Sequence, residues 1–252
     1  MGVNTIYSGR IMEEKGVSPV ISMVIITATL LVILVIASFF ATNLLEIQIQ
    51  NSEFEQAKTA MLLLDKTIMD VSLRRGAASS VQFNQRSGGL GIHEGDMFNI
   101  TVLEGSNLVW SNASRSYVIK YRGGSMVSTA QMSLTDPGGL IVTDPSKSLG
   151  HVRIETGNGA WIVLDYNRMR VIKNLGTLDI YLIRLEPGAF GGSGTVSVRV
   201  QNRDIRVTSK QLSGPSNLSV HVDVDSQGDE WGPYSGISIV RIVEVFIKVS
   251  IM

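Results

Sequence analysis

Side chains that could bind a metal or act as nucleophiles are scarce in this sequence. The chain has no cysteine and three histidines, at positions 93, 151 and 221. The lack of cysteine excludes disulfides, thiol catalysis and cysteine-bound zinc or iron–sulfur clusters. No histidine has a second histidine or a carboxylate at ligand spacing on a predicted helix, so we expect all three on surface strands or loops. The sequence therefore does not predict a histidine-based metal centre.

Catalytic and nucleotide-binding motifs are also absent from the sequence. Neither G-x-x-x-x-G-K-[ST] nor G-x-G-x-x-G occurs, so no phosphate-binding loop is predicted. The serine-nucleophile motif G-x-S-x-G does not occur either. We therefore expect a protein that is not an enzyme and that needs no cofactor.

One acidic stretch resembles the first part of a calcium-binding loop. Asp223, Asp225 and Asp229 place carboxylates close together, with Gly228 at the sixth position. The stretch departs from the calcium pattern because Gln227 replaces the usual Asp or Asn, and because the twelfth position is tyrosine and not glutamate. A solvated turn after a strand is the favoured interpretation, and the three aspartates are a weak metal candidate.

Three N-x-[ST] sequons occur, at Asn99, Asn112 and Asn217. Such sequons are acceptors for N-linked glycans on exported proteins. Asn112 lies between Trp110 and Arg115 in a predicted turn, which makes it the best placed of the three. If this part of the chain is exported, the sequons predict a glycoprotein.

The element that dominates the first part of the chain is a long apolar run. No charged residue occurs between Lys15 and Glu46, a gap of 30 positions. A helix needs roughly 20 apolar residues to span a bilayer, whereas the apolar part of a secretory signal has roughly 7–15. A buried core helix is the weaker alternative, because such helices seldom lack a polar stripe. The run therefore predicts a transmembrane helix.

The helix is expected to continue beyond the apolar run. Gly16 is followed by no glycine until Gly76, which predicts one helix over 17–75 that divides at 45. In the second part, 46–75, apolar residues recur at alternating spacings of 3 and 4, as in a coiled coil. We call these positions the seam: Phe54, Ala57, Met61, Leu64, Ile68 and Val71. The charged residues expected on the other faces are Glu53, Glu55, Lys58, Lys66 and Asp70. The seam should pack against the rest of the subunit and its neighbours.

Beyond Gly76 the apolar period changes from helical to two. Ten to twelve short runs rich in β-branched and aromatic residues predict an all-β antiparallel sandwich or barrel-like head over 76–252. Glycine-containing turns predict hairpins at 104–105, 157–159 and 191–194. The last run, 237–251, is apolar on both faces, which is typical of a central strand.

The sequence EEKGVSPVI, from Glu13 to Ile21, resembles the start of archaeal type IV pilin precursors. The resemblance covers about residues 10–45. It implies a leader of residues 1–16, removed by a prepilin peptidase that cuts between Gly16 and Val17. It also implies that the apolar helix, 17–45, packs in the core of a filament. Bacterial type IV pilins typically carry glutamate at mature position five, where Ile21 stands here, so the archaeal pattern fits better.

Two functions follow from these features. The first is a structural subunit of an archaeal type IV pilus or related surface filament, whose partners are the membrane, the prepilin peptidase and other pilin subunits. A head of 177 residues is large for a major pilin, which favours a minor or adhesive one. The alternative is an envelope protein that stays anchored in the membrane and carries an extracellular ligand-binding or sensory β-domain. With 22 basic and 22 acidic residues, the chain has no net charge to attract nucleic acid.

Overall fold

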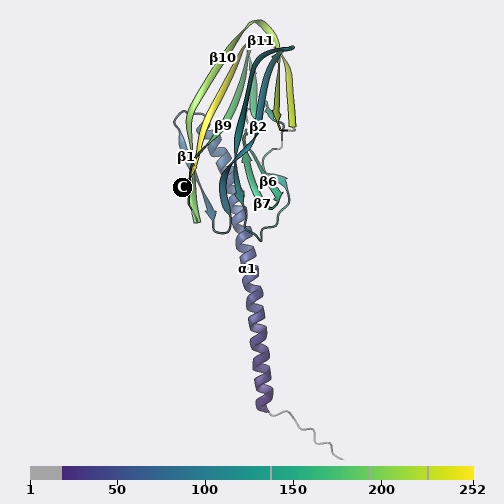
Figure 1. Cartoon of the computed structure of the whole chain (residues 1–252), viewed down its shortest axis with the longest axis vertical. Helices are drawn as coiled ribbons and strands as arrows, with labels where there is room; N and C mark the ends of the chain where they lie inside the picture. The colour runs from purple at the N-terminus through teal and green to yellow at the C-terminus, as the bar shows by residue number, and fades with distance from the viewer. Residues whose placement is uncertain (1–18, 137, 193, 226) are drawn as a thin grey trace, which may run out of the picture. The chain divides into compact units, whose positions relative to one another are not determined.

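The computed structural model describes residues 19–252 except Pro137, Ser193 and Ser226. The predicted leader and the predicted cleavage site at Gly16 and Val17 therefore lie outside the described residues. The chain divides into two compact units, one ending at Glu46 and the other running from Ile47 to Met252. Figure 1 shows the ribbon with its elements labelled.

The single helix that the structure describes is α1 (Pro19–Ser72). Proline is tolerated in the first turn, because its missing N–H would have had no partner inside the helix. The helix ends three residues before the predicted limit at residue 75. The side-chain amide of Asn202 donates to the carbonyls of Val71 and Ser72 at 3.1 and 3.2 Å, which satisfies two terminal acceptors. Gly76, the predicted stop signal, adopts a positive φ of 80° four residues beyond.

The part of α1 in the first unit is long and apolar enough to cross a membrane. One window of 18 residues has a mean hydropathy of 3.0, and none of it is buried. The hydroxyls of Thr27, Thr29 and Thr42 donate to helix carbonyls four residues earlier at 2.8–2.9 Å. Since these polar groups are satisfied within the helix, they add little to the cost of placing it in lipid.

The second unit contains eleven described strands. Together with α1, they confirm the prediction of a long N-terminal helix followed by a β-rich head. The strands are β1 (Ala78–Gln85), β2 (Gly89–Glu104), β3 (Asn107–Arg122), β4 (Met132–Ser133), β5 (Ile141–Val142), β6 (His151–Gly157), β7 (Gly159–Asp165), β8 (Met169–Asn174), β9 (Thr177–Phe190), β10 (Gly194–Val224) and β11 (Gln227–Ile251). Their order in the sheet is β4-β6-β7-β3-β2-β10-β11-β9-β8-β5, and β1 pairs with β10. The final strand, β11, lies between β10 and β9 and is central, as expected.

Most strand pairs are antiparallel, but two of the described pairs are parallel, β9 with β11 and β5 with β8. The expectation of a wholly antiparallel head is wrong at these pairs. The predicted hairpin at 191–194 is also wrong, because β11 lies between the two strands that this segment joins. The chain reverses once between β9 and β10 and again between β10 and β11, so β11 runs in the direction of β9. The hairpins at 104–105 and 157–159 are confirmed by the pairs Glu104–Asn107 and Gly157–Gly159.

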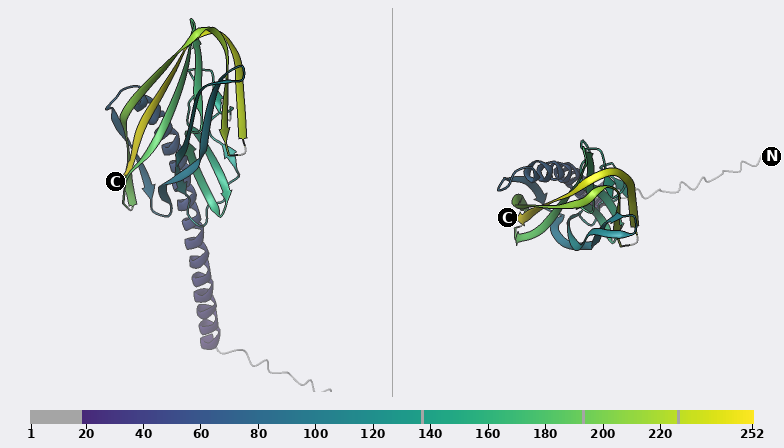
Figure 2. Two further views of the ribbon diagram at one scale, coloured as in Figure 1. Left: turned by 45° about the horizontal axis from the view of Figure 1, so that its top comes forward. Right: turned by 90° about the horizontal axis from the view of Figure 1, so that it is seen from above.

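The long strands β10 and β11 take part in two regions of the head. The first part of β10 pairs with β1, from Gly194 to Gln201, and its last part pairs with β2, from Leu218 to Val224. From Asn202 to Val220 the register with β11 shifts repeatedly, at 202–204, 211–216, 216–218 and 218–220. Such irregularities bend strands, and Figure 2 shows the pair curving over one end of the head.

The bend separates two hydrophobic cores. The first, which we call the helix core, contains the six seam residues together with side chains of β1, β3, β6, β7 and the paired regions of β9, β10 and β11. The second, the strand core, has no helical residue and is built from Phe98, Ile100 and Val102 of β2, Leu218, Val220 and Val222 of β10, and side chains of β8, β9 and β11. The helix is therefore an integral part of one core and absent from the other.

Candidate functional site

The seam of α1 is buried within the second unit. Met61, Leu64 and Ile68 are fully inaccessible, and Phe54, Ala57 and Val71 are at most 4% exposed. Burying a side chain such as Leu64 contributes roughly 1.5–3 kcal/mol. The six positions together make this part of the helix a large contributor to the stability of the head.

Glu53, beside the seam, is also buried, which corrects its placement on an outer face of the helix. It is 6% exposed, and its carboxylate accepts hydrogen bonds from the main-chain N–H groups of Arg86, Ser87 and Gly88 at 3.0–3.1 Å. The hydroxyls of Ser87 and Tyr121 donate to it as well, at 2.6 and 2.7 Å. These groups come from the turn between β1 and β2 and from β3. Glu53 therefore holds the turn against the helix.

The surroundings of Glu53 favour its ionised form. Burial acts to raise its pKa, but the hydrogen bonds from Ser87, Tyr121 and Gly88 outweigh burial and lower the pKa below its ordinary value. Burial and the neighbouring carboxylate both raise the pKa of Tyr121, which keeps its hydroxyl protonated and able to donate.

A second buried carboxylate, Asp65, lies three turns further along the helix. It is 5% exposed and accepts hydrogen bonds from the hydroxyls of Tyr166 at 2.7 Å and Ser148 at 3.0 Å. Burial raises its pKa, because these two bonds and the attraction of Arg168 do not offset the loss of water. Gly150 is required beside it, since a methyl group at that position would overlap the Asp65 carboxylate.

The sequence pattern did not reveal these two carboxylates. A search for apolar periodicity treats acidic residues as solvent-facing, because carboxylates are rarely buried without partners. The partners of Glu53 follow it by 33–35 residues and by 68, so no local spacing indicates them. One local feature does indicate that Glu53 lies near the core, because it immediately precedes Phe54 of the seam.

The three aspartates of the weak calcium candidate are not gathered into a metal site. Asp223 is exposed, and Asp225 lies in the turn of the β10–β11 hairpin with a φ of 49°. Asp229 accepts a hydrogen bond from the main-chain N–H of Ile141 at 3.1 Å. In the described part of the chain, no three His, Cys, Asp or Glu side chains are arranged to hold a metal ion. The stretch is a hairpin turn between two strands.

The structure separates the three sequons. Asn99 on β2 and Asn217 on β10 are exposed. Asn112 lies within β3 and not in a turn, and its amide donates to Glu244 Oε1 at 3.0 Å. The predicted turn at Asn112 is wrong because the chain reverses earlier, at Gly105. The nitrogen that a glycan would occupy on Asn112 is already engaged inside the head.

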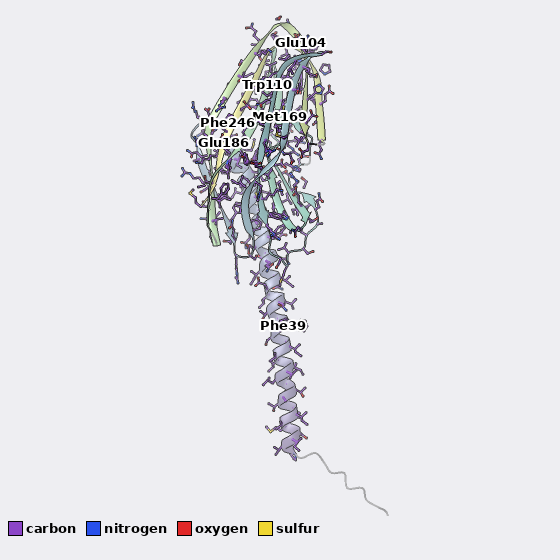
Figure 3. All side chains as sticks on the ribbon, viewed as in Figure 1. Phe39, Glu104, Trp110, Met169, Glu186 and Phe246 are labelled. Carbon is purple, nitrogen blue, oxygen red and sulfur yellow. The ribbon has the colours of Figure 1, made fainter. Side chains whose placement is uncertain are left out.

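A polar cleft of about 920 Å³ opens on the head, with walls from several strands and loops. Its lining residues are Asp96, Gln131, Gly138, Gly139, Leu140, His151, Arg153, Asp165, Asn167, Arg168, Val224, Asp225, Gln227, Gly228 and Asp229. They come from β2, β6, β7, β10, β11 and the connecting segments at 131, 138–140, 167–168 and 225. Met169, labelled in Figure 3, directly follows Arg168 on the chain.

Several side chains of the cleft are held in place by one another. Arg153 forms an ion pair with Asp165, which is 4% exposed. One terminal nitrogen of Arg168 donates to the carbonyls of Asp136 and Gly138 at 3.0 and 2.8 Å. Burial, together with the two arginines, lowers the pKa of His151 to about 4, so this imidazole is neutral at pH 7. The cleft thus presents fixed polar groups and has no cationic histidine.

Comparison of the chain with protein-family models, with curated proteins and with solved structures found no match.

Proposed function

We propose that this protein is a pilin-like structural subunit of an archaeal type IV pilus or related surface filament. A prepilin peptidase would cut after Gly16, and the head would lie outside the cell membrane. The observation that carries the proposal is the division of α1. Its first part is apolar on all sides and unburied, while its second part is buried along one face. A subunit that moves from membrane to filament needs both parts.

The apolar part of α1 suits such a transfer energetically. In lipid a helix satisfies its own main-chain hydrogen bonds, so the subunit is stable in the membrane as a single chain. On entering a filament core, the side chains exchange contacts with acyl chains for contacts with other helices. Phe39, labelled in Figure 3, is 66% exposed and is one of the side chains that would make this exchange. The apolar area in contact with water changes little, so assembly has a low energetic cost.

The large head supports a minor or adhesive role within the filament. It carries its own strand core, which the helix does not enter, and the polar cleft. A subunit that only builds the shaft needs neither.

N-terminal sequencing of the protein from its native membrane tests the proposal directly. A mature chain that starts at Val17 supports it, whereas an intact Met1 contradicts it. The variant Gly16→Asp should accumulate at full precursor length, because a peptidase pocket beside a small residue has little room for a carboxylate. Normal processing of that variant would show that the cut does not lie between Gly16 and Val17.

The alternative is an envelope protein that stays anchored and uses its β-domain to bind a ligand or sense a signal. The polar cleft is the observation that favours it, because its volume falls in the range typical of small-molecule sites, about 300–1,000 Å³. The same sequencing experiment separates the two functions, since the alternative requires an uncut N-terminus.

A further inference from the structure

Two of the three sequons lie on one face of the sheet formed by β2 and β10. Thr101 of β2 stands directly opposite His221 of β10. Directly opposed residues of neighbouring strands share a face, and so do residues two apart within a strand. Asn99 is therefore on the same face as Thr101, and Asn217 and Ser219 are on the same face as His221. Each sequon presents its amide and its hydroxyl side by side on this common face.

This face points away from the strand core and is mostly polar. The residues that alternate with it are at most 1% exposed: Phe98, Ile100 and Val102 of β2, and Leu218, Val220 and Val222 of β10. The outward residues of the paired segments are Asn99, Thr101, Leu103, Ser219, His221 and Asp223. A large hydrophilic group attached here would displace no buried side chain.

The amide of Asn99 has open space around it. Asn99 is exposed, and its neighbours on the adjoining strands are Ala113 and Asp223, both with short side chains. Its amide makes no hydrogen bond with any described residue. Its nitrogen is therefore available for a covalent bond to a sugar.

Asn217 lies where β10 is paired least regularly. The register of β10 with β11 shifts between Ser216 and Leu218, so Asn217 has no partner residue on β11. Pairing with β2 starts one residue later, at Leu218, which stands opposite Glu104 (labelled in Figure 3). An irregularity of this kind leaves the extra residue outside the ladder. Asn217 is exposed, and its amide also makes no hydrogen bond within the described chain.

The third sequon is turned into the head. The amide of Asn112 donates to Glu244 at 3.0 Å, and Glu244 pairs with Arg184, which is 9% exposed, at 3.4 Å. The hydroxyl oxygen of Ser114, the other half of this sequon, is inaccessible to solvent. A glycan on Asn112 would break the bond to Glu244 and would have no room.

We propose that Asn99 and Asn217 carry N-linked oligosaccharides and that Asn112 carries none. The inference rests on the part of the proposed function that places the head outside the membrane. The donor is an oligosaccharide linked to a lipid phosphate. The amide nitrogen bonds to the anomeric carbon of the sugar, the bond between that carbon and the phosphate oxygen breaks, and the lipid phosphate leaves as the amide loses one proton. Two bulky, solvated groups then cover this face of the head.

Mass spectrometry of glycopeptides from the native protein tests the proposal. Trypsin leaves Asn99 and Asn112 on one peptide, because no lysine or arginine lies between Arg86 and Arg115, so a second digestion after Glu104 is needed. We expect a glycan on the peptides of Asn99 and Asn217 and an unmodified Asn112. A glycan on Asn112, or the lack of one on Asn99 or Asn217, would overturn the proposal.

Variants of the sequon hydroxyls check each assignment without changing an asparagine. Thr101→Ala and Ser219→Ala should each lower the mass of the protein by one glycan, whereas Thr101→Ser keeps the sequon and should keep the glycan. Ser114→Ala is the matched control and should leave the number of glycans unchanged. Loss of a glycan in Ser114→Ala, or equal masses for Thr101→Ala and the wild type, would contradict the proposal.

The same digests separate this inference from the proposed function. A chain that starts at Val17 but has bare Asn99 and Asn217 would overturn the inference and leave the pilin proposal standing. A chain that keeps Met1 and carries both glycans would contradict the pilin proposal and support the inference.

Discussion

The two parts of α1 are one helix with two different surroundings. In the first unit, side chains such as Leu31 and Leu34 are 59% and 66% exposed, and apolar residues occupy every face. In the second unit, Leu64 and Ile68 are fully inaccessible, while Leu63 on another face is 53% exposed. Uniform apolarity therefore indicates a helix that requires lipid or other helices, and periodic apolarity indicates one that packs on its own chain.

The polar groups of the two parts follow the same division. In the first unit, threonine hydroxyls bond to the helix's own carbonyls. In the second unit, the side chains accept hydrogen bonds from distant parts of the chain. The donor to Gln50 lies 76 positions away, main-chain donors to Glu53 lie 33 to 35 positions away, and the donors to Asp65 lie 83 and 101 positions away. The threonine hydroxyls of the first part bond within the helix, while the second part is joined to the head by its polar side chains.

The largest expected effect comes from charges in the seam. Leu64→Glu combined with Ile68→Lys removes two buried apolar side chains, so the free energy of unfolding of the head should fall by about 3–6 kcal/mol. Membrane insertion should be intact, since residues 17–45 are unchanged, and filaments should not form. Limited proteolysis in detergent, together with filament yield, measures the outcome.

The matched control places the same pair of charges in the first part of the helix. Leu31→Glu with Val35→Lys has the same spacing but no buried contact to lose. We expect it to impair membrane insertion and to leave the protease resistance of the head unchanged. A head that is equally resistant in both double variants would remove the distinction between the two parts of α1.

A smaller effect is expected at Glu53. Glu53→Gln keeps the shape of the side chain but removes the negative charge that accepts hydrogen bonds from five donors. We therefore expect the free energy of unfolding to fall by about 2–3 kcal/mol at pH 7. Because the folded state lowers the pKa of Glu53, its contribution is present above the unfolded pKa and is lost as the pH falls through the folded value. Urea unfolding at pH 7 and at pH 3 measures both effects.

Glu55→Gln is the control for Glu53, two residues away on the exposed side of the helix. Among the described residues, the ion pair of its carboxylate is a local one, with Lys58 at 2.6 Å. The urea midpoint should not change. A shift as large as that of Glu53→Gln would show that the hydrogen bonds to the 86–88 turn contribute nothing specific.

The smallest effect is expected at Asp65. Asp65→Asn retains an oxygen acceptor for Tyr166 and Ser148 and removes a charge that burial disfavours, so stability at pH 7 should change by less than about 1 kcal/mol. The folded state raises the pKa of Asp65, so in the wild type this group lowers stability as the pH rises through the window between the unfolded and folded values. The variant should lack this component of the pH profile. A loss comparable to that of Glu53→Gln would mean that the Asp65 charge is needed.

The residues that were predicted correctly from the sequence all belong to local patterns. The alternation of 3 and 4 located all six seam positions, and glycine located the turns at Gly105 and Gly159. The wrong predictions concern residues whose role depends on contacts with distant parts of the chain. Asn112 continues a strand and bonds to Glu244, 132 residues away, and the direction of β9 relative to β11 depends on the route taken between them.

The order of the residues is enough to predict the helix, its apolar and periodic parts, and the β-rich head, because side-chain period and backbone preference act over a few residues. Tertiary structure decided the burial of Glu53 and Asp65, the two cores and the polar cleft. Each of these brings together groups separated by tens of residues, such as Asp65 and Tyr166. Strand order and the bend of β10 and β11 decide which distant groups meet. Contacts between residues so far apart in the chain leave no short-range pattern in the sequence.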